Sequence, residues 1–269
     1  MSDRPFLKRF NRSTWFGLFF FSLILSAWLY FSPPGLLGKA DAIGYAVCHR
    51  IHARSFDLGE RQLPLCARCS GMYLGAFVGL LYHFKTGRKG GFPPRKILFA
   101  LGFLLILFGV DGVNSYVHLL PNFPGLYEPN NIFRLITGTG VGLGMSIILM
   151  PIVHQSFWQF WDSEPAVKNW RELIGLLIGA LITSSLMLTE NPLLLYPLAL
   201  ASAFTVLAIL GLIYTIVWVM ILKKENAFST TGDLIGYLFL GFGTAILQIL
   251  VIDLARLIIT GTWNGFNFL

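Results

Sequence analysis

The sequence predicts an all-α integral membrane protein, a polytopic helix bundle with about seven transmembrane helices. Of its 269 residues, 55% are hydrophobic and only 12% are charged. The charged residues fall in short clusters that separate long apolar runs. This combination is typical of proteins that cross a bilayer several times and excludes an ordinary water-soluble domain.

Apolar runs of at least about 18 residues are long enough to cross a hydrocarbon core about 30 Å thick. In chain order, such runs predict spans over 14–31, 97–119, 132–152, 173–189, 196–222 and 234–259. A shorter run at 70–84 is counted as the seventh span, but it rises only about 22 Å as a helix. We therefore expect the Cys66-Ala67-Arg68-Cys69 turn before it to lie at the outer membrane interface or to dip into it. We treat 1–269 as one membrane domain, with 33–69 as an outer motif segment and 70–259 as the remaining bundle.

The first span resembles a cleavable signal peptide, because basic residues precede it. These are Arg4, Lys8, Arg9 and Arg12. However, the apolar run is long, and no small-x-small cleavage pattern precedes Pro33-Pro34-Gly35. We therefore expect a retained membrane anchor.

The distribution of basic residues predicts the orientation, since cytoplasmic loops near span ends collect Lys and Arg. With the N-terminus inside, thirteen of the twenty Lys and Arg residues fall on the inner side. We therefore expect a plasma-membrane protein with a cytoplasmic N-terminus and with its cysteines and C-terminus outside. The net charge of +7 then reflects topology. No base-reading element is present, so we expect no nucleic-acid partner.

Glycines recur every four residues in two of the predicted spans. They form the sets Gly71/Gly75/Gly79, Gly138/Gly142 and Gly140/Gly144. Small residues at this spacing allow membrane helices to approach closely. The pattern predicts close helix packing.

All three cysteines lie within one short segment, beside two of the five histidines. Cys66 and Cys69 form a Cys-x-x-Cys knuckle that can present both sulfurs to one tetrahedral ion, and Cys48 can add a third ligand. His52 lies four residues after Cys48 and shares its face if that segment is helical. His49 can bind instead if the helix ends there. The pattern favours a Cys₃His zinc site.

Two other interpretations of the cysteines stay open. Cys66 and Cys69 could form a disulfide or a redox pair, which an outer location favours. Alternatively, the three cysteines are interfacial residues with no special role.

The residue order around the cysteines is similar to that of a known family. Cys-His, then Arg-Ser-Phe, then Pro-Leu-Cys-Ala-Arg-Cys-Ser-Gly-Met-Tyr-x-Gly resembles an uncharacterised family of prokaryotic multi-pass membrane proteins with a domain of unknown function. Asp111-Gly112 and Asn131-x-x-Arg134-x-x-Thr137-Gly138 resemble its second and third blocks. The similarity covers about 44–144 and implies the fold and a prokaryotic origin, but no reaction.

The resemblance also implies which positions to test. These are Cys48, His49, Arg54, Cys66, Arg68, Cys69, Asp111, Asn131 and Arg134. His52 stands where we expect the family to have a proline. The resemblance therefore favours His49 over His52 as the fourth metal ligand.

Polar residues within the spans gather in their outer halves. They are Asp111, Asn114, His118, Arg134, Glu190, Asp253 and Arg256. Ionisable groups at such depth are usually paired or functional. They either form ion pairs that fix helix packing, such as Asp111–Arg134 and Asp253–Arg256, or line an outward-facing polar cavity.

These residues support two functional hypotheses. In the first, the protein is an enzyme at the outer leaflet. Arg54, Arg68 and Arg134 grip the phosphate of an anionic phospholipid or polyprenyl-phosphate head group, Asp111 acts as base or ligand, and zinc or a thiolate supplies the chemistry. In the second, the metal knuckle is structural and the bundle transports, binds lipid or assembles with a partner. His-Glu-x-x-His and Gly-x-Ser-x-Gly are absent, which favours the second.

Overall fold

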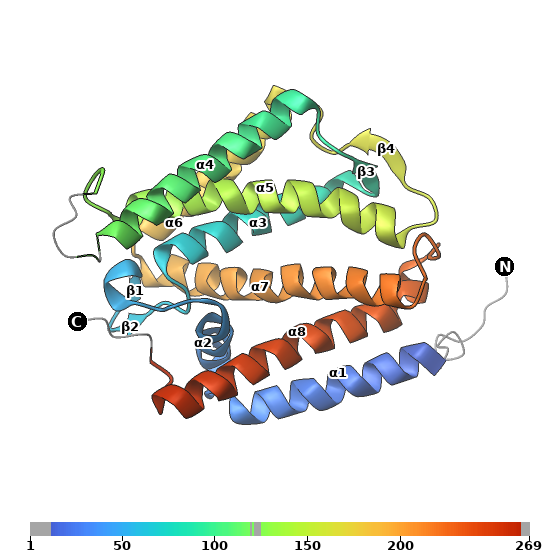
Figure 1. Ribbon diagram of the computed structural model, residues 1–269, viewed down its shortest axis with the longest axis horizontal. Helices are drawn as coiled ribbons and strands as arrows, with labels where there is room; N and C mark the ends of the chain where they lie inside the picture. Colours follow the sequence, from blue (N-terminus) through green and yellow to red (C-terminus); the bar gives the residue numbers. More distant parts are fainter. Residues whose placement is uncertain (1–11, 119, 121–124, 265–269) are drawn as a thin grey trace.

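The computed structural model describes residues 12–118, 120 and 125–264 (Figure 1). Arg4, Lys8 and Arg9 of the predicted basic N-terminus lie outside the described residues, as does position 119 at the end of a predicted span. Within the described part, the chain forms eight α-helices. They are α1 (Arg12–Phe31), α2 (Gly35–Val47), α3 (Ala67–Thr86), α4 (Arg95–Val117), α5 (Asn131–Phe157), α6 (Trp170–Leu188), α7 (Pro192–Ile221) and α8 (Thr231–Thr260).

Four short strands and one 3₁₀ turn complete the described elements. Strands β1 (Asp57–Leu58) and β2 (Arg61–Gln62) form an antiparallel pair that follows the turn η2 (His52–Arg54). Strands β3 (Lys89–Gly91) and β4 (Asp162–Pro165) pair in parallel at the opposite end of the bundle. We call the end with α2, β1 and β2 the motif end, and the other end the β3–β4 end.

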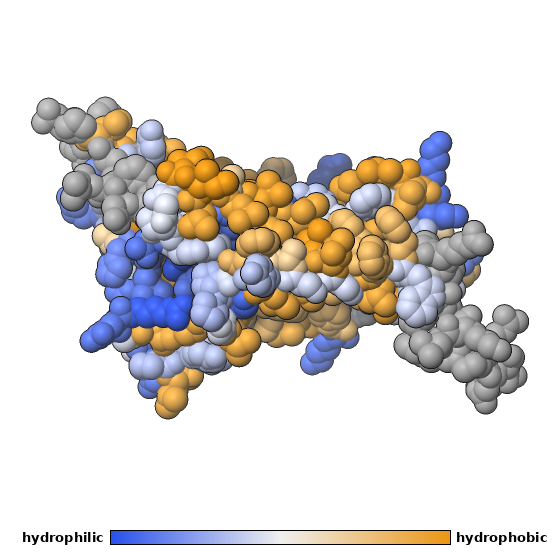
Figure 2. Space-filling model, turned by 90° about the horizontal axis from the view of Figure 1, so that it is seen from below, coloured by the Kyte–Doolittle hydropathy of each residue, from blue (hydrophilic) through white to orange (hydrophobic). Residues whose placement is uncertain are grey.

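The long helices confirm the predicted membrane fold. Six of them, α1 and α4 to α8, are long and apolar enough to cross a membrane. They run roughly along the long axis of the molecule in Figure 1. Figure 2 shows apolar side chains over the middle of one face, with hydrophilic ones gathered at the motif end.

Helix α3 is longer than the sequence predicted. It has 20 residues and therefore rises about 30 Å. The apolar run was read as 70–84, but the helix begins at Ala67 and continues through Lys85 and Thr86. Its polar ends hid its true length, so the predicted short helix over 70–84 is wrong in length.

Close packing of α3 against α5 confirms the expectation from the glycine spacing. A Cβ atom on Gly71 would lie 2.2 Å from the carbonyl oxygen of Leu135, and one on Gly142 would lie 1.7 Å from that of Met72. Gly75, Gly79 and Gly138 face atoms of the partner helix at similar distances. The two helices thus touch through their backbones, which fixes the first turn of α3 beside the start of α5.

Helix α2 is a short element that the apolar pattern did not predict. Its 13 residues pack against α7 and α8 at the motif end. Lys39 and Asp41 interrupt its apolar residues, so the segment reads as a polar loop in the sequence. The helix ends at Val47, one residue before the first cysteine.

Candidate metal centre

The three cysteines come together where α2 ends and α3 begins. The sulfur atoms of Cys48, Cys66 and Cys69 all lie within 4.8 Å of one another. Cys48 directly follows α2, Cys66 is the N-cap of α3, and Cys69 lies in its first turn. Gly44 makes this junction possible, because a Cβ there would lie 1.9 Å from the carbonyl oxygen of Pro64.

Apolar side chains surround the cysteine cluster. Cys48 and Cys66 are buried, Cys69 is half-buried, and all three are free thiols. The surrounding residues come from α1, α2, α7 and α8. They include Trp28, Ile43, Ala203, Val206, Ile246, Ile249 and Leu250. The cluster is therefore largely shielded from water.

The pKa values of the thiols shift in opposite directions. The pKa of Cys48 lies well below its usual range, because Cys66 and Cys69 donate hydrogen bonds to it. The same contact with Cys48 raises the pKa of Cys66 to about 12. The backbone N–H of Cys66 adds a bond of 3.4 Å to the sulfur of Cys48. Three thiolates packed this closely would repel one another, and a bound cation would offset their charge.

The two candidate histidines lie in different places. The ring of His49 is half-buried, and its Nδ1 accepts a hydrogen bond of 2.9 Å from the N–H of Ile51. Burial lowers the pKa of His49, which favours the neutral form that binds metals. The side chain of His52 is 71% exposed and lies 3.3 Å from the carboxylate of Asp57.

Neither histidine belongs to the group of atoms gathered within 4.8 Å. The expected shared face of Cys48 and His52 does not form, because α2 ends at Val47 and the chain turns at Arg50, whose φ is +52°. His49 lies next to the cysteines in the chain and stays the predicted fourth ligand.

A buried ion pair lies beside the cysteines. Arg68, in the first turn of α3, pairs with the carboxylate of Asp111 on α4 and also donates to the hydroxyl of Ser115 at 3.0 Å. Asp111 is only 1% exposed, and its second oxygen accepts a hydrogen bond of 2.7 Å from Tyr127. The partner of Asp111 is thus Arg68, and the expected pair with Arg134 does not form among the described residues.

Two further arginines have no carboxylate partner in the part of the chain that the structure describes. Arg54 donates to the carbonyl oxygen of Ser115 at 3.0 Å, and Arg134 donates to the side chain of Asn131 at 2.8 Å. Burial, followed by repulsion from Arg68, lowers the pKa of Arg54. Among the described residues, Asp111 is the one carboxylate that pairs with Arg54, Arg68 or Arg134. One negative charge against three positive charges leaves this cluster positive.

Arg256 of α8 has a role that the sequence did not indicate. It donates hydrogen bonds to the carbonyl oxygens of Tyr45, Cys48 and His49. The predicted Asp253–Arg256 pair does not form, since neither oxygen of Asp253 has a hydrogen-bond partner among the described residues. A cation beside the carbonyl oxygens at and just after the end of α2 complements the helix dipole. Arg256 therefore fixes the position of Cys48.

The loop between the cysteines is also held in place. Arg50 donates to Asp41 of α2 at 2.9 Å, and Arg61 pairs with the other oxygen of the same carboxylate. Gln62 donates to the carbonyl oxygen of Arg50 at 2.9 Å and to the hydroxyl of Ser55 at 2.8 Å. The hairpin β1–β2 is thereby tied to α2.

The fold and this site define a multi-pass membrane protein with a buried three-cysteine cluster at one end of its bundle. Residues 48–148 match the family described as "Predicted membrane protein (DUF2085)", and the chain belongs to that family. The match begins at Cys48 and contains every position that the sequence resemblance pointed to. The resemblance to an uncharacterised prokaryotic membrane family is confirmed.

Two archaeal proteins are similar to part of the chain. An uncharacterized protein of Methanothermobacter thermautotrophicus is 32% identical over 108 residues, which are 40% of this chain and 88% of that protein. An uncharacterized protein of Methanocaldococcus jannaschii is 29% identical over 119 residues, which are 44% of this chain and 70% of that protein. No solved structure matches.

Proposed function

We propose that Cys48, Cys66 and Cys69 bind one zinc ion that joins α2 to α3 in a membrane protein whose wider activity is open. The observation that carries this proposal is the convergence of the three sulfur atoms within 4.8 Å. Tetrahedral zinc with bonds of about 2.3 Å places its sulfur ligands about 3.8 Å apart. Sulfur atoms that lie within 4.8 Å of one another are compatible with this spacing.

The fourth ligand decides what the ion does. Ligation by His49 gives a closed Cys₃His site, and such sites are structural. With only the three cysteines bound, the fourth position is open to water or substrate, as in catalytic zinc sites. We favour the closed site, because His49 directly follows Cys48 and its Nε2 is not used by the bond from Ile51.

Elemental analysis of the purified protein by mass spectrometry tests this proposal. About one zinc per chain is expected in protein prepared without chelators. Cys48→Ser, Cys66→Ser and Cys69→Ser should each lose it, and His52→Ala is the matched control that should keep it. Loss in His49→Ala identifies the closed site. Wild-type protein without zinc would contradict the proposal.

A second candidate function is binding of a phosphate-bearing lipid head group, such as an anionic phospholipid or a polyprenyl phosphate. It is supported by the buried Arg134 and the half-buried Arg54, neither of which has a carboxylate partner among the described residues. Arginine donors suit phosphate oxygens. In this proposal Asp111 positions Arg68 through their ion pair.

Lipid extraction from the purified protein tests this second function. Arg54→Gln and Arg134→Gln should reduce the anionic lipid that co-purifies, while the zinc content stays constant. Arg61→Gln provides a control at an exposed arginine of the same end. Unchanged lipid content in both variants would refute head-group binding at this cluster.

We also propose that the motif end faces outward from the plasma membrane and that the N-terminus is cytoplasmic. The support is that many basic residues follow or precede helix termini at the β3–β4 end. These are Lys85, Arg88, Lys89, Arg95, Lys96, Lys168, Arg171, Lys223 and Lys224. Such an excess is typical of cytoplasmic sides.

A further inference from the structure

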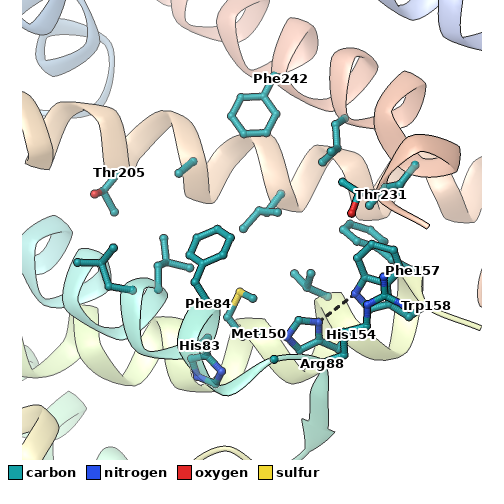
Figure 3. Close-up of a pocket in the computed structure, with 18 of the residues that line it drawn as sticks. His83, Phe84, Arg88, Met150, His154, Phe157, Trp158, Thr205, Thr231 and Phe242 are labelled. Atoms are coloured by element: carbon teal, nitrogen blue, oxygen red, sulfur yellow. Dashed lines mark hydrogen bonds between the residues drawn. The ribbon is translucent and has the colours of Figure 1, made fainter. Parts of the chain in front are cut away.

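A cavity lies at the end of the bundle opposite the cysteines. It encloses about 510 Å³ between side chains of α3 and α5 on one side and of α7 and α8 on the other (Figure 3). Its walls are almost entirely aliphatic and aromatic. A volume of this size with an apolar lining is typical of a ligand site.

The cavity is bordered by residues on the outer surface of the bundle. Leu81 and Phe84 of α3 and Phe204 of α7 line it and are also exposed, Phe84 by 78%. Because these helices cross or lie within the membrane region, their exposed apolar side chains face lipid. A hydrocarbon chain can therefore enter from the bilayer without passing through water.

One end of the cavity is polar. Arg88 follows α3 by two residues, and its guanidinium carbon lies 3.6 Å from the centre of the Trp158 ring. It donates to the carbonyl oxygen of Ser229 at 3.1 Å, and no described carboxylate pairs with it. Trp158 directly follows the candidate span α5, and a Trp in this position is typical of the depth of the lipid head groups.

The nearest carboxylate along α8 is already occupied. Asp233 accepts hydrogen bonds from the N–H of Thr230 at 3.0 Å and from its hydroxyl at 2.7 Å, and so caps its own helix. Thr231, next to this cap, lines the cavity. Among the described residues Asp233 forms no ion pair with Arg88, whose guanidinium can therefore meet an anion.

Two buried histidines lie beside this polar end. His83 of α3 is 1% exposed, and neither of its ring nitrogens has a hydrogen-bond partner among the described residues. His154 of α5 accepts a bond from Trp158 at 3.2 Å, but its Nε2 has no such partner. Buried polar groups are normally satisfied, but these nitrogens are closed off from the cavity, so a polar ligand could reach them only after side chains move.

We propose that this cavity binds one acyl chain of an anionic phospholipid from the leaflet at the β3–β4 end, with the lipid phosphate beside Arg88. The apolar walls hold the chain, and the guanidinium meets the phosphate at head-group depth. This site is separate from the cysteine cluster and does not depend on zinc.

Fluorescence quenching by brominated lipids tests the site in the full-length protein. The chain is reconstituted into phosphatidylcholine vesicles that contain either brominated-chain phosphatidylglycerol or the same share of brominated-chain phosphatidylcholine. The emission of Trp158 is obtained as the difference between wild type and Trp158→Phe. Half-maximal quenching should need about tenfold less brominated phosphatidylglycerol in the vesicle than brominated phosphatidylcholine, as expected for a charge-assisted contact between Arg88 and the head group.

Two variants separate the head-group contact from the chain contact. Arg88→Gln should remove the preference for phosphatidylglycerol, while Arg171→Gln, at an exposed arginine of the same end, should keep it. Ala208→Phe fills the cavity and should reduce quenching by both lipids. If Arg88→Gln does not fold, the wild-type lipid comparison and Ala208→Phe still decide the outcome.

Three results would overturn the proposal. Equal quenching by the two lipids excludes an anionic head group at Arg88. Absence of Trp158 quenching excludes a chain in the cavity. Unchanged quenching in Ala208→Phe with the lipid preference intact shows that the lipid binds only to the outer surface.

Discussion

Replacing Gly142 with alanine should weaken the contact between α3 and α5, whereas the same change at Gly144 should not. A Cβ on Gly142 would lie 1.7 Å from the carbonyl oxygen of Met72, which cannot move without shifting α3. A Cβ on Gly144 would lie 3.7 Å from the side chain of Leu101, which is an ordinary contact. The two glycines are two residues apart in one helix and face different neighbours.

The matched pair isolates the cost of helix separation. Both variants gain the same intrinsic helix propensity of about 1 kcal/mol, so this gain cancels in their difference. Overpacking of a close contact costs about 1–3 kcal/mol. Gly142→Ala should therefore be less stable than Gly144→Ala by about 2 kcal/mol, or about 4–8 °C in the melting midpoint.

Thermal melting of the detergent-solubilised protein, followed by the amount that remains monodisperse, measures this difference. Zinc content supplies a second readout, because α3 carries Cys69 and follows Cys66 directly. Gly109→Ala is a further control, since no atom lies within 4 Å of a Cβ there. Equal melting of Gly142→Ala and Gly144→Ala would show that the backbones of α3 and α5 are not in contact.

Three other outcomes follow from the motif end. Arg68→Gln should lower the free energy of unfolding by about 3–5 kcal/mol, because it leaves the Asp111 carboxylate buried without its cation. Asp111→Asn in the same chain should restore part of this stability. Losses in the melting midpoint that simply add up would argue against the ion pair. A zinc chelator should lower the melting midpoint of wild type but not of Cys66→Ser, and an equal decrease in both would exclude stabilisation by metal. Glu60→Cys should react with an impermeant thiol reagent in intact cells and Lys224→Cys only after lysis, whereas the opposite pattern would invert the topology.

The elements that the sequence predicted are those with a strong local signal. Long apolar runs located the six long spans, and the spacing of Gly71, Gly75 and Gly79 indicated the close packing of α3. Helix α2 was missed because it is short, contains charged residues and is stabilised by tertiary packing against α7 and α8. The true length of α3 was hidden by the polar residues at its ends.

The candidate site was predictable in composition but only partly in geometry. The cysteine spacing predicted that the three sulfurs meet, and they do. The similar predicted depth of Asp111 and the arginines indicated that they lie close together. It did not indicate whether Asp111 pairs with Arg68 or with Arg134, because periodicity does not say which helix faces meet. The hydrogen bonds from Arg256 to backbone carbonyl oxygens could not be predicted either, because every residue has a carbonyl oxygen and the sequence does not indicate which one accepts.

The apolar wall around the cysteines extends beyond the segment that defines the family. Ala203, Val206 and Ile249 belong to α7 and α8, well after the matched residues 48–148. The matched segment alone therefore lacks the residues that shield the cysteines on this side, and in this protein the two C-terminal helices supply them.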